Sequence, residues 1–251
     1  MAKLTIADLH AMKRDHKKIA AMIVYDYQMA RIADMAGADL LTIGDSLGRN
    51  ILGQADVHEC SVDDMIPFAK AVVKAAEHAV VSVDMPMTPS HAGPKEVTEA
   101  ARRFKALGVD MTKIDLRTME EELFDEVRAV IDVGLGVWPQ IGYPTQGPTR
   151  GVQTGPAVRD HVLKWAKAIE DAGGSMIDLT NVTPDIYAEV CANVKLPVIG
   201  GQATPEADGK ISGLSPRSEN IGQEVRGRAN VAQFIYDQAQ DLIGNIRAGK
   251  Y

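Results

Sequence analysis

The chain has 251 residues, of which 45% are hydrophobic and 24% charged, and its formal net charge is −7. This size and composition fit a globular α/β protein, and an acidic charge without a lysine/arginine block argues against a nucleic-acid partner. No apolar run approaches the roughly 18 residues that span a bilayer, so no membrane partner is expected. Two cysteines without a close-spaced motif and no signal-peptide pattern predict a cytoplasmic location.

Strand-like apolar runs alternate with helix-length segments in the first half of the chain. The runs predict strands at 18–25, 40–44, 79–83 and 109–114. The segments between them predict helices at 28–36, about 61–76 and 94–107. Ser61 and Asp64 have the spacing of a capping box, and Gly37 and Gly108 stand where helices commonly end.

The same alternation continues in the second half of the chain. After an acidic helix start at 119–122, the predicted elements are a strand at 136–142, a helix at 157–172, a strand at 175–179, a helix at 184–193 and a strand at 197–200. Residues 201–226 are predicted to be irregular, and 229–247 to form a final amphipathic helix. Seven or eight βα units in this length predict an α/β fold, a (β/α)8 TIM barrel forming a single domain over 1–251.

The polar segment 143–156, rich in Gly, Pro, Thr and Gln, interrupts this pattern. Such a long polar segment inside a compact domain is typical of a mobile active-site loop, and a linker is the alternative.

Three carboxylates stand at the ends of predicted strands: Asp45, Asp84 and Asp115. Because the carboxyl ends of parallel strands share one rim of a barrel, these acids are predicted to form an oxygen-ligand site for Mg²⁺ and an oxygen-rich substrate. Ser46 offers a hydroxyl and an N–H to a substrate carboxylate, and Lys113 lies on the same strand face as Asp115. The alternatives are a helix cap for Asp45 and a local ion pair for Lys113.

Other polar features are less specific. His91 lies in the loop after Asp84 and could reach the rim, His58 precedes a helix start, and the remaining histidines are predicted at surface or packing positions (His10, His16, His78 and His161). The stretch 200–204, which begins with two glycines, could bind an anion or allow tight strand packing. The sequence has no P-loop, dinucleotide fingerprint, zinc-ligand spacing or nucleophile elbow.

Several motifs, in the same order and nearly end to end, resemble ketopantoate hydroxymethyltransferase. They include Tyr25-Asp26-Tyr27, Ala33-Asp34, Gly44-Asp45-Ser46-Leu47-Gly48, Val83-Asp84-Met85-Pro86, Asp208-Gly209-Lys210-Ile211 and Arg247-Ala248-Gly249-Lys250-Tyr251. The resemblance implies a barrel of the phosphoenolpyruvate mutase and isocitrate lyase type. It also implies an enzyme that forms a homo-oligomeric ring.

The family binds the 2-oxo acid 3-methyl-2-oxobutanoate with Mg²⁺ and adds a hydroxymethyl group from methylenetetrahydrofolate. By resemblance, Asp45 and Asp84 are the direct metal ligands, and Ser46 and Lys113 hold the substrate carboxylate. Asp115 falls where the family has a glutamate near the metal, so it is expected to act through water or to leave a larger pocket. Mn²⁺ and Co²⁺ are alternatives to Mg²⁺ that the sequence does not distinguish.

The chain departs from the family in the half of the site that moves protons. Gln140 replaces a histidine, and Thr180 replaces the glutamate that acts as acid/base near the reacting carbon. The Glu-Gly-Gly after the family's lysine is replaced by Asp115-Leu116-Arg117. Because a threonine hydroxyl cannot take that proton at neutral pH, the base is left open among four groups: Asp178, His91, Arg117 and a metal-bound hydroxide.

These observations support three hypotheses of function. The first is enolate chemistry on a 2-oxo acid, namely hydroxymethyl transfer to 3-methyl-2-oxobutanoate or a close analogue, with Lys113, Asp115, Gln140 and Thr180 at the reacting centre. The second is a Mg²⁺-dependent C–C lyase or hydrolase acting on a different 2-oxo acid. The third is a catalytically silent paralogue that binds a ligand. Metal-dependent turnover would exclude the third, and folate dependence would separate the first two.

Overall fold

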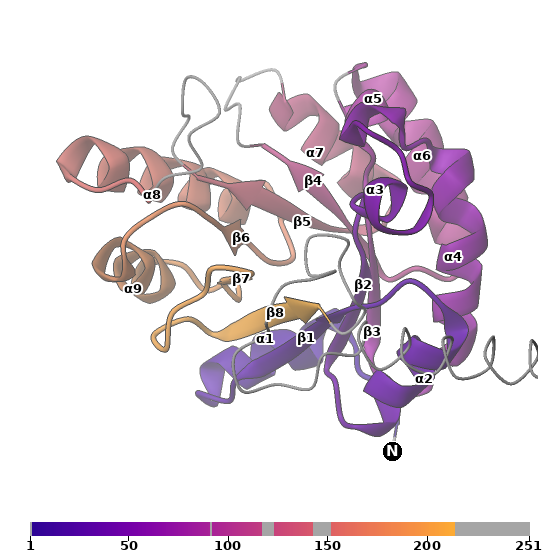
Figure 1. Cartoon of the computed structure of the whole chain (residues 1–251). Helices are drawn as coiled ribbons and strands as arrows, with labels where there is room; N and C mark the ends of the chain where they lie inside the picture. Colours follow the sequence, from indigo (N-terminus) through magenta and orange to yellow (C-terminus); the bar gives the residue numbers. More distant parts are fainter. Residues whose placement is uncertain (1, 91, 117–122, 143–151, 214–251) are drawn as a thin grey trace, which may run out of the picture. The chain divides into compact units, whose positions relative to one another are not determined.

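The structure, a computed structural model, describes residues 2–90, 92–116, 123–142 and 152–213 (Figure 1). Eight parallel strands form one sheet in the order β6-β5-β4-β3-β2-β1-β8-β7. Their bounds are β1 Ile19–Ile23, β2 Leu40–Ile43, β3 Val80–Asp84, β4 Met111–Asp115, β5 Gly136–Ile141, β6 Asp178–Leu179, β7 Ile199–Gly200 and β8 Gly209–Gly213. A parallel bridge between Ile177 and Val198 joins the two edge strands. The sheet therefore closes into the predicted (β/α)8 barrel.

Helices occupy the connections between the strands (Figure 1). Their bounds are α1 Ile6–Arg14, α2 Tyr27–Met35, α3 Leu47–Ile51, η1 Val57–Glu59 (a 3₁₀ helix), α4 Val62–Ala75, α5 Met87–Ser90, α6 Pro94–Ala106, α7 Leu123–Asp132, α8 Pro156–Asp171 and α9 Pro184–Asn193. The predicted capping box of α4 is confirmed, since Ser61 and Asp64 each bond the other's backbone N–H. Gly37 and Gly108 follow α2 and α6 with φ of 92° and 89°, conformations that favour glycine. No helix among the described residues is long and apolar enough to cross a membrane.

The prediction that residues 201–226 are irregular was wrong for 209–213, which form β8. This strand has one large apolar side chain, Ile211, so its own sequence does not have the apolar pattern of a buried strand. It is buried because it pairs with β1. The short helices α3 and α5 were not predicted either. The loop residues 143–151 and the predicted helix at 229–247 lie outside the described residues, so these predictions and the single-domain assignment remain predictions.

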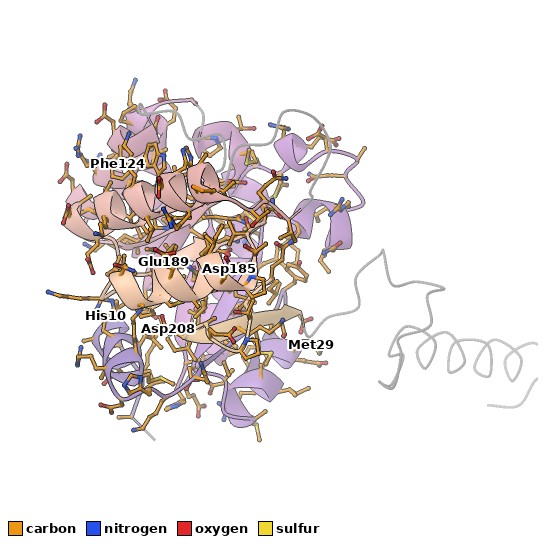
Figure 2. All side chains as sticks on the ribbon, turned by 90° about the vertical axis from the view of Figure 1, so that its left-hand side faces the viewer. His10, Met29, Phe124, Asp185, Glu189 and Asp208 are labelled. Carbon is orange, nitrogen blue, oxygen red and sulfur yellow. The ribbon has the colours of Figure 1, made fainter. Side chains whose placement is uncertain are left out.

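Helix α1, also absent from the prediction, closes the amino-terminal end of the barrel. Its Leu9 is fully buried in the interior cluster that lines the barrel. Lys13 Nζ fixes the helix by donating to the Leu196 carbonyl at 2.8 Å and pairing with Asp208 Oδ2 at 2.8 Å. His10, labelled in Figure 2, contacts the Ser175 carbonyl at 2.6 Å. This is a packing role, in agreement with the sequence expectation.

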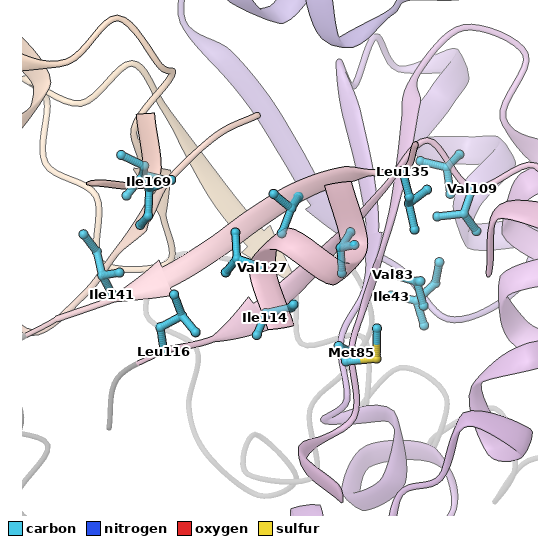
Figure 3. Close-up of a cluster of buried hydrophobic side chains, with 14 of the residues drawn as sticks. Ile43, Val83, Met85, Val109, Ile114, Leu116, Val127, Leu135, Ile141 and Ile169 are labelled. Atoms are coloured by element: carbon cyan, nitrogen blue, oxygen red, sulfur yellow. The ribbon is translucent and has the colours of Figure 1, made fainter. Parts of the chain in front are cut away.

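Alternation along the strands separates two hydrophobic clusters. One face of each strand packs against the helices, where Ile43, Val83, Ile114 and Ile141 lie in the large outer cluster (Figure 3). The opposite face points into the barrel, whose lower part is filled by an apolar set: Ile19, Ala21, Leu40, Val80, Met111, Trp138, Met176, Ile199 and Ile211. The barrel is therefore a packed core at its amino-terminal end.

Polar side chains replace this apolar filling toward the carboxyl ends of the strands. In a closed barrel, alternate strands contribute the residues of each interior layer. The strand registers place Thr42, Lys113, Asp178 and Ile211 in one such layer, and Asp84 with Gln140 one level above. The interior thus becomes charged at the rim, where the sequence predicts the site.

A stability prediction concerns Asp34 on α2, which belongs to one of the family-like motifs. Its buried carboxylate accepts the backbone N–H groups of Glu77, His78 and Ala79 at 3.2, 3.0 and 2.8 Å. Replacing Asp34 by alanine leaves these donors unpaired at the entrance to β3, so we expect the free energy of unfolding to fall by about 2–4 kcal/mol. Urea denaturation measures this, with Asp63→Ala, which removes an exposed carboxylate, as control. Equal stability of the two variants would contradict the structural role of Asp34.

Candidate active site

A buried ion-pair network lies at the carboxyl end of the barrel. Lys113 Nζ, on β4, lies 3.2 Å from Asp84 Oδ2 at the end of β3 and 3.5 Å from Asp178 Oδ2 on β6. The lysine also lies over the Trp138 ring, 5.9 Å from its centroid. The structure therefore brings two of the predicted residues, Asp84 and Lys113, into direct contact. It adds Asp178, which the sequence offered only as one of four candidate bases.

Asp45 and Ser46 approach this network from the loop after β2. The Asp45 N–H donates to Asp84 Oδ2 at 3.4 Å. A Cβ on Gly44 would lie 2.8 Å from Ser46 Oγ and 3.6 Å from Asp84 Oδ2, so glycine at 44 is what allows the backbone to pass this close. Ser46, rather than Asp45, is the N-cap residue of α3.

Two side chains that the site prediction did not include position Ser46. The Tyr25 hydroxyl lies 2.8 Å from Ser46 Oγ, and Asn50 Nδ2 donates to the Tyr25 hydroxyl at 3.1 Å. Tyr25 follows β1 and contacts Ser46 directly, whereas the Asn50 side chain, in α3, acts on Ser46 through Tyr25. The sequence singled out Tyr25 only as part of a family-like motif. Its role at Ser46 could not be predicted, because the contact depends on the pairing of β1 with β2.

Negative charge exceeds positive charge in this buried group. Burial raises the pKa of Asp84 to about 7, since it disfavours the ionised form; Lys113 opposes this rise, and the Asp45 carboxylate adds to it. Burial alone would lower the pKa of Lys113, but Asp84, Asp178 and Asp45 outweigh burial and raise it. The lysine therefore stays charged, and one cation faces several carboxylates.

This charge imbalance fits a divalent cation. Asp84 Oδ1 is buried and has no hydrogen-bond partner among the described residues. The described part of the chain contains no group of three or more His, Cys, Asp or Glu side chains that could hold a metal ion, so the predicted trio with Asp115 is not gathered as a three-ligand cluster. Mg²⁺ does not require one, because it is commonly held by one or two carboxylates together with waters and substrate oxygens.

Two residues that depart from the family, Gln140 and Thr180, lie on the β5 and β6 side of the rim. Gln140 is half-buried on β5, where its backbone pairs with that of Asp115 and Asp178. Thr180 is buried, and its hydroxyl donates weakly to the Ile141 carbonyl at 3.4 Å. This side therefore presents neutral side chains at both substituted positions.

The remaining predicted features have structural roles or lie outside the described residues. His91 and Arg117 belong to the undescribed segments. His58 pairs with Asp56 at 2.6 Å on the surface. A Cβ on Gly200 would lie 2.9 Å from the Leu179 carbonyl, which favours tight packing over anion binding for this stretch.

A groove of about 840 Å³ lies away from this site, between α6 and α7. Its charged residues include Lys105, which donates to the Val133 carbonyl, and Arg128, which pairs with Asp125 at 3.1 Å. Those interactions are typical of a solvated surface, so we place the chemistry at the barrel rim, where the charges are buried.

Solved structures identify the class of barrel. A 2,3-dimethylmalate lyase of the PEP mutase/isocitrate lyase superfamily matches with a TM-score of 0.67 and 17% identity, over 98% of this chain and 89% of its own. Phosphonopyruvate hydrolase, in complex with oxalate and Mg²⁺, matches with a TM-score of 0.69 and 14% identity, over 98% and 88%. The chain therefore has the barrel fold of the PEP mutase/isocitrate lyase superfamily.

Sequence comparison identifies the family within that class. The family model for ketopantoate hydroxymethyltransferase matches residues 3–250. The 3-methyl-2-oxobutanoate hydroxymethyltransferase of Acidothermus cellulolyticus is 30% identical, over 99% of this chain and 94% of the relative. That of Pyrobaculum calidifontis is also 30% identical, over 100% and 97%. The chain belongs to the ketopantoate hydroxymethyltransferase family, and the predictions of family and of an enzyme are confirmed.

Proposed function

We propose that this enzyme carries out divalent-cation-dependent enolate chemistry on a 2-oxo acid, with hydroxymethyl transfer from methylenetetrahydrofolate to 3-methyl-2-oxobutanoate as its reaction. The observation that carries the proposal is the buried Asp84–Lys113 pair beside Ser46. The pair offers an anionic group for a cation and a cationic group for a carboxylate within one small space. A 2-oxo acid presents matching groups, a carboxylate and a keto oxygen that chelate one metal ion.

The cation would be held by Asp45 and Asp84, with Asp115 acting through water, and Mn²⁺ or Co²⁺ would serve in place of Mg²⁺. When bound, it would supply Lewis-acid polarisation of the keto oxygen. The Mg²⁺ and oxalate in the phosphonopyruvate hydrolase structure support this assignment, because oxalate has two adjacent carboxylates and a 2-oxo acid has similarly adjacent oxygens.

Lys113 and Ser46 would hold the substrate carboxylate. The Lys113 ammonium group also faces Asp178 and the Trp138 ring, so its charge would remain in place if Asp84 bound a cation. Ser46 is oriented by Tyr25, which leaves its hydroxyl at a fixed position on the rim. The C3 end of the substrate would then face Gln140 and Thr180.

A second candidate function is a C–C lyase or hydrolase acting on a different 2-oxo acid. The observation that favours it is Thr180, a neutral buried residue at the position where the family carries its acid/base. An enzyme that keeps the proposed cation ligands Asp45 and Asp84 but changes the residue that moves the proton is suited to a 2-oxo acid with a different substituent at C3.

The experiment that tests the proposed function is ¹H NMR of 3-methyl-2-oxobutanoate in D₂O with enzyme and Mg²⁺, without folate, beside Asp84→Ala. If the C3 proton signal disappears with wild type but persists with Asp84→Ala, the enzyme forms the enolate. Formation of ketopantoate on addition of methylenetetrahydrofolate would then identify the transferase. Enolate formation without folate-dependent product would favour the second candidate, and no exchange at all would reject 3-methyl-2-oxobutanoate as substrate.

Cation binding is expected to depend on pH near neutrality. A proton and a cation compete for Asp84, whose pKa without metal is about 7. Above that pH the carboxylate is ionised, whereas below it each pH unit should weaken the apparent Mg²⁺ affinity by up to about tenfold. Isothermal titration calorimetry between pH 6 and 8 measures this. Affinity that is independent of pH over this range would contradict Asp84 as a ligand.

A further inference from the structure

Among the described residues, Asp178 is the buried carboxylate in the barrel interior that the proposed function leaves without a chemical role. It is 2% exposed and lies on β6, two residues before Thr180. Because side chains alternate along a strand, Asp178 and Thr180 share the face that points into the barrel. Its backbone register with Gln140 places it at the side of the site where C3 of the substrate would lie.

The surrounding residues make room for a carboxylate at this position. A Cβ on Gly200 would lie 2.5 Å from Asp178 Oδ1, so any other residue at 200 would displace the acid. The other oxygen, Oδ2, faces Lys113 Nζ at 3.5 Å. Burying a carboxylate is costly unless a charge compensates it, and Lys113 supplies that charge.

Binding of a cation at Asp84 would change the pairing of Lys113. Lys113 lies between Asp84 and Asp178. Once Asp84 faces a cation, as the proposed function requires, Asp178 is the carboxylate that remains beside the lysine. That leaves an aspartate paired with the lysine at the floor of the site, two residues before Thr180, whose hydroxyl cannot act as the base.

We propose that Asp178 is the proton-transfer group of this enzyme and replaces the acid/base that the family carries at the position of Thr180. This inference rests on the proposed function. The Asp178 carboxylate takes the C3 proton, and the C–H electron pair forms the C2–C3 double bond while the keto oxygen becomes an oxyanion. Hydrolysis of the two C–N bonds of methylenetetrahydrofolate by one water releases tetrahydrofolate and supplies formaldehyde. The enolate C3 then attacks the formaldehyde carbon, the C=O π pair becomes an alkoxide, and the protonated Asp178 gives its proton to that alkoxide oxygen.

The test compares four proteins by C3 exchange of 3-methyl-2-oxobutanoate in D₂O with Mg²⁺: wild type, Asp178→Asn, Thr180→Glu and the double variant. Asp178→Asn should lose about 10²–10⁴-fold in exchange rate, the usual contribution of a general base. Its Mg²⁺ binding should be retained, because Asp45 and Asp84 are intact. The double variant, which places a carboxylate where the family has it, should recover most of the exchange, whereas a purely structural defect would not be rescued by Thr180→Glu.

Each other outcome has a defined meaning. Exchange by wild type that persists in Asp178→Asn overturns this inference and leaves the proposed function intact. Failure of the double variant to recover exchange also overturns it, and assigns Asp178 to the positioning of Lys113. No exchange by wild type rejects the proposed function itself. If Asp178→Asn does not fold, the Thr180→Glu variant alone tests the inference. A large gain in its exchange rate over wild type would show that the wild type lacks a base and would overturn the inference. An exchange rate close to that of wild type would support Asp178 as the base.

Discussion

Replacing Asp84 by asparagine is expected to abolish Mg²⁺ binding and to lower the rate of C3 exchange by roughly 10³-fold or more, the effect of losing several kcal/mol of electrostatic stabilisation. Asparagine keeps the shape of the side chain but removes the charge that a cation needs. The same substitution should leave the metal-free protein as stable as wild type or more so. Burial raises the pKa of Asp84 to about 7, above its value in the unfolded chain, so this carboxyl costs stability increasingly as the pH rises toward 7 and in full above it.

Thermal unfolding with EDTA and with Mg²⁺ separates these two effects. Wild type should gain stability from Mg²⁺, whereas Asp84→Asn should start from an equal or higher melting temperature and gain nothing. Asp63→Asn, which changes an exposed carboxylate on α4, serves as control and should respond to Mg²⁺ as wild type does. A Mg²⁺-dependent rise in the melting temperature of Asp84→Asn would sink the assignment of this residue as a ligand.

The sequence could predict most of the barrel because its strands are buried on both faces and its helices carry local signals. The apolar run before Asp84 and the capping box at Ser61 are complete within a few residues, so they need no tertiary information. Strand β8 lacks such a signal, since its burial comes from β1. Helix α1 does carry a local signal, the capping box of Thr5 and Asp8, so the sequence contained enough to predict it.

The site, too, has a part that the sequence could predict and a part that depends on the three-dimensional structure. Asp84 and Lys113 could be predicted because each stands at a strand end, and strand ends share one rim. The contacts of Lys113 with Asp178, and of Tyr25 with Ser46, join residues from different strands, so they depend on register and barrel closure. Motif membership alone was a poor guide: Asp34 belongs to a family-like motif, yet its carboxylate caps backbone N–H groups far from the rim.

Replacing Lys113 by methionine should destabilise the metal-free protein by about 3–5 kcal/mol, the cost of leaving buried carboxylates without their cation. Methionine fills a similar volume, so the loss comes from charge rather than from packing. Asp84 and Asp178 would then face each other across the barrel without the ammonium group between them. Mg²⁺ should restore part of this stability, because a divalent cation bound at Asp84 reduces the same repulsion. Substrate binding should remain weak, since the group proposed to hold the carboxylate is gone.

Lys13→Met supplies a matched control for this prediction. Lys13 is also a half-buried lysine that pairs with an aspartate, Asp208, but it lies at the opposite end of the barrel. Its loss should destabilise the protein in urea denaturation, and Mg²⁺ should recover no more stability than it adds to wild type. If Mg²⁺ stabilised both lysine variants equally, the cation would not be acting at the Asp84 site. A larger Mg²⁺ effect in Lys113→Met than in wild type would show that lysine and metal compensate the same carboxylates, so that the excess negative charge at the rim is what binds the cation.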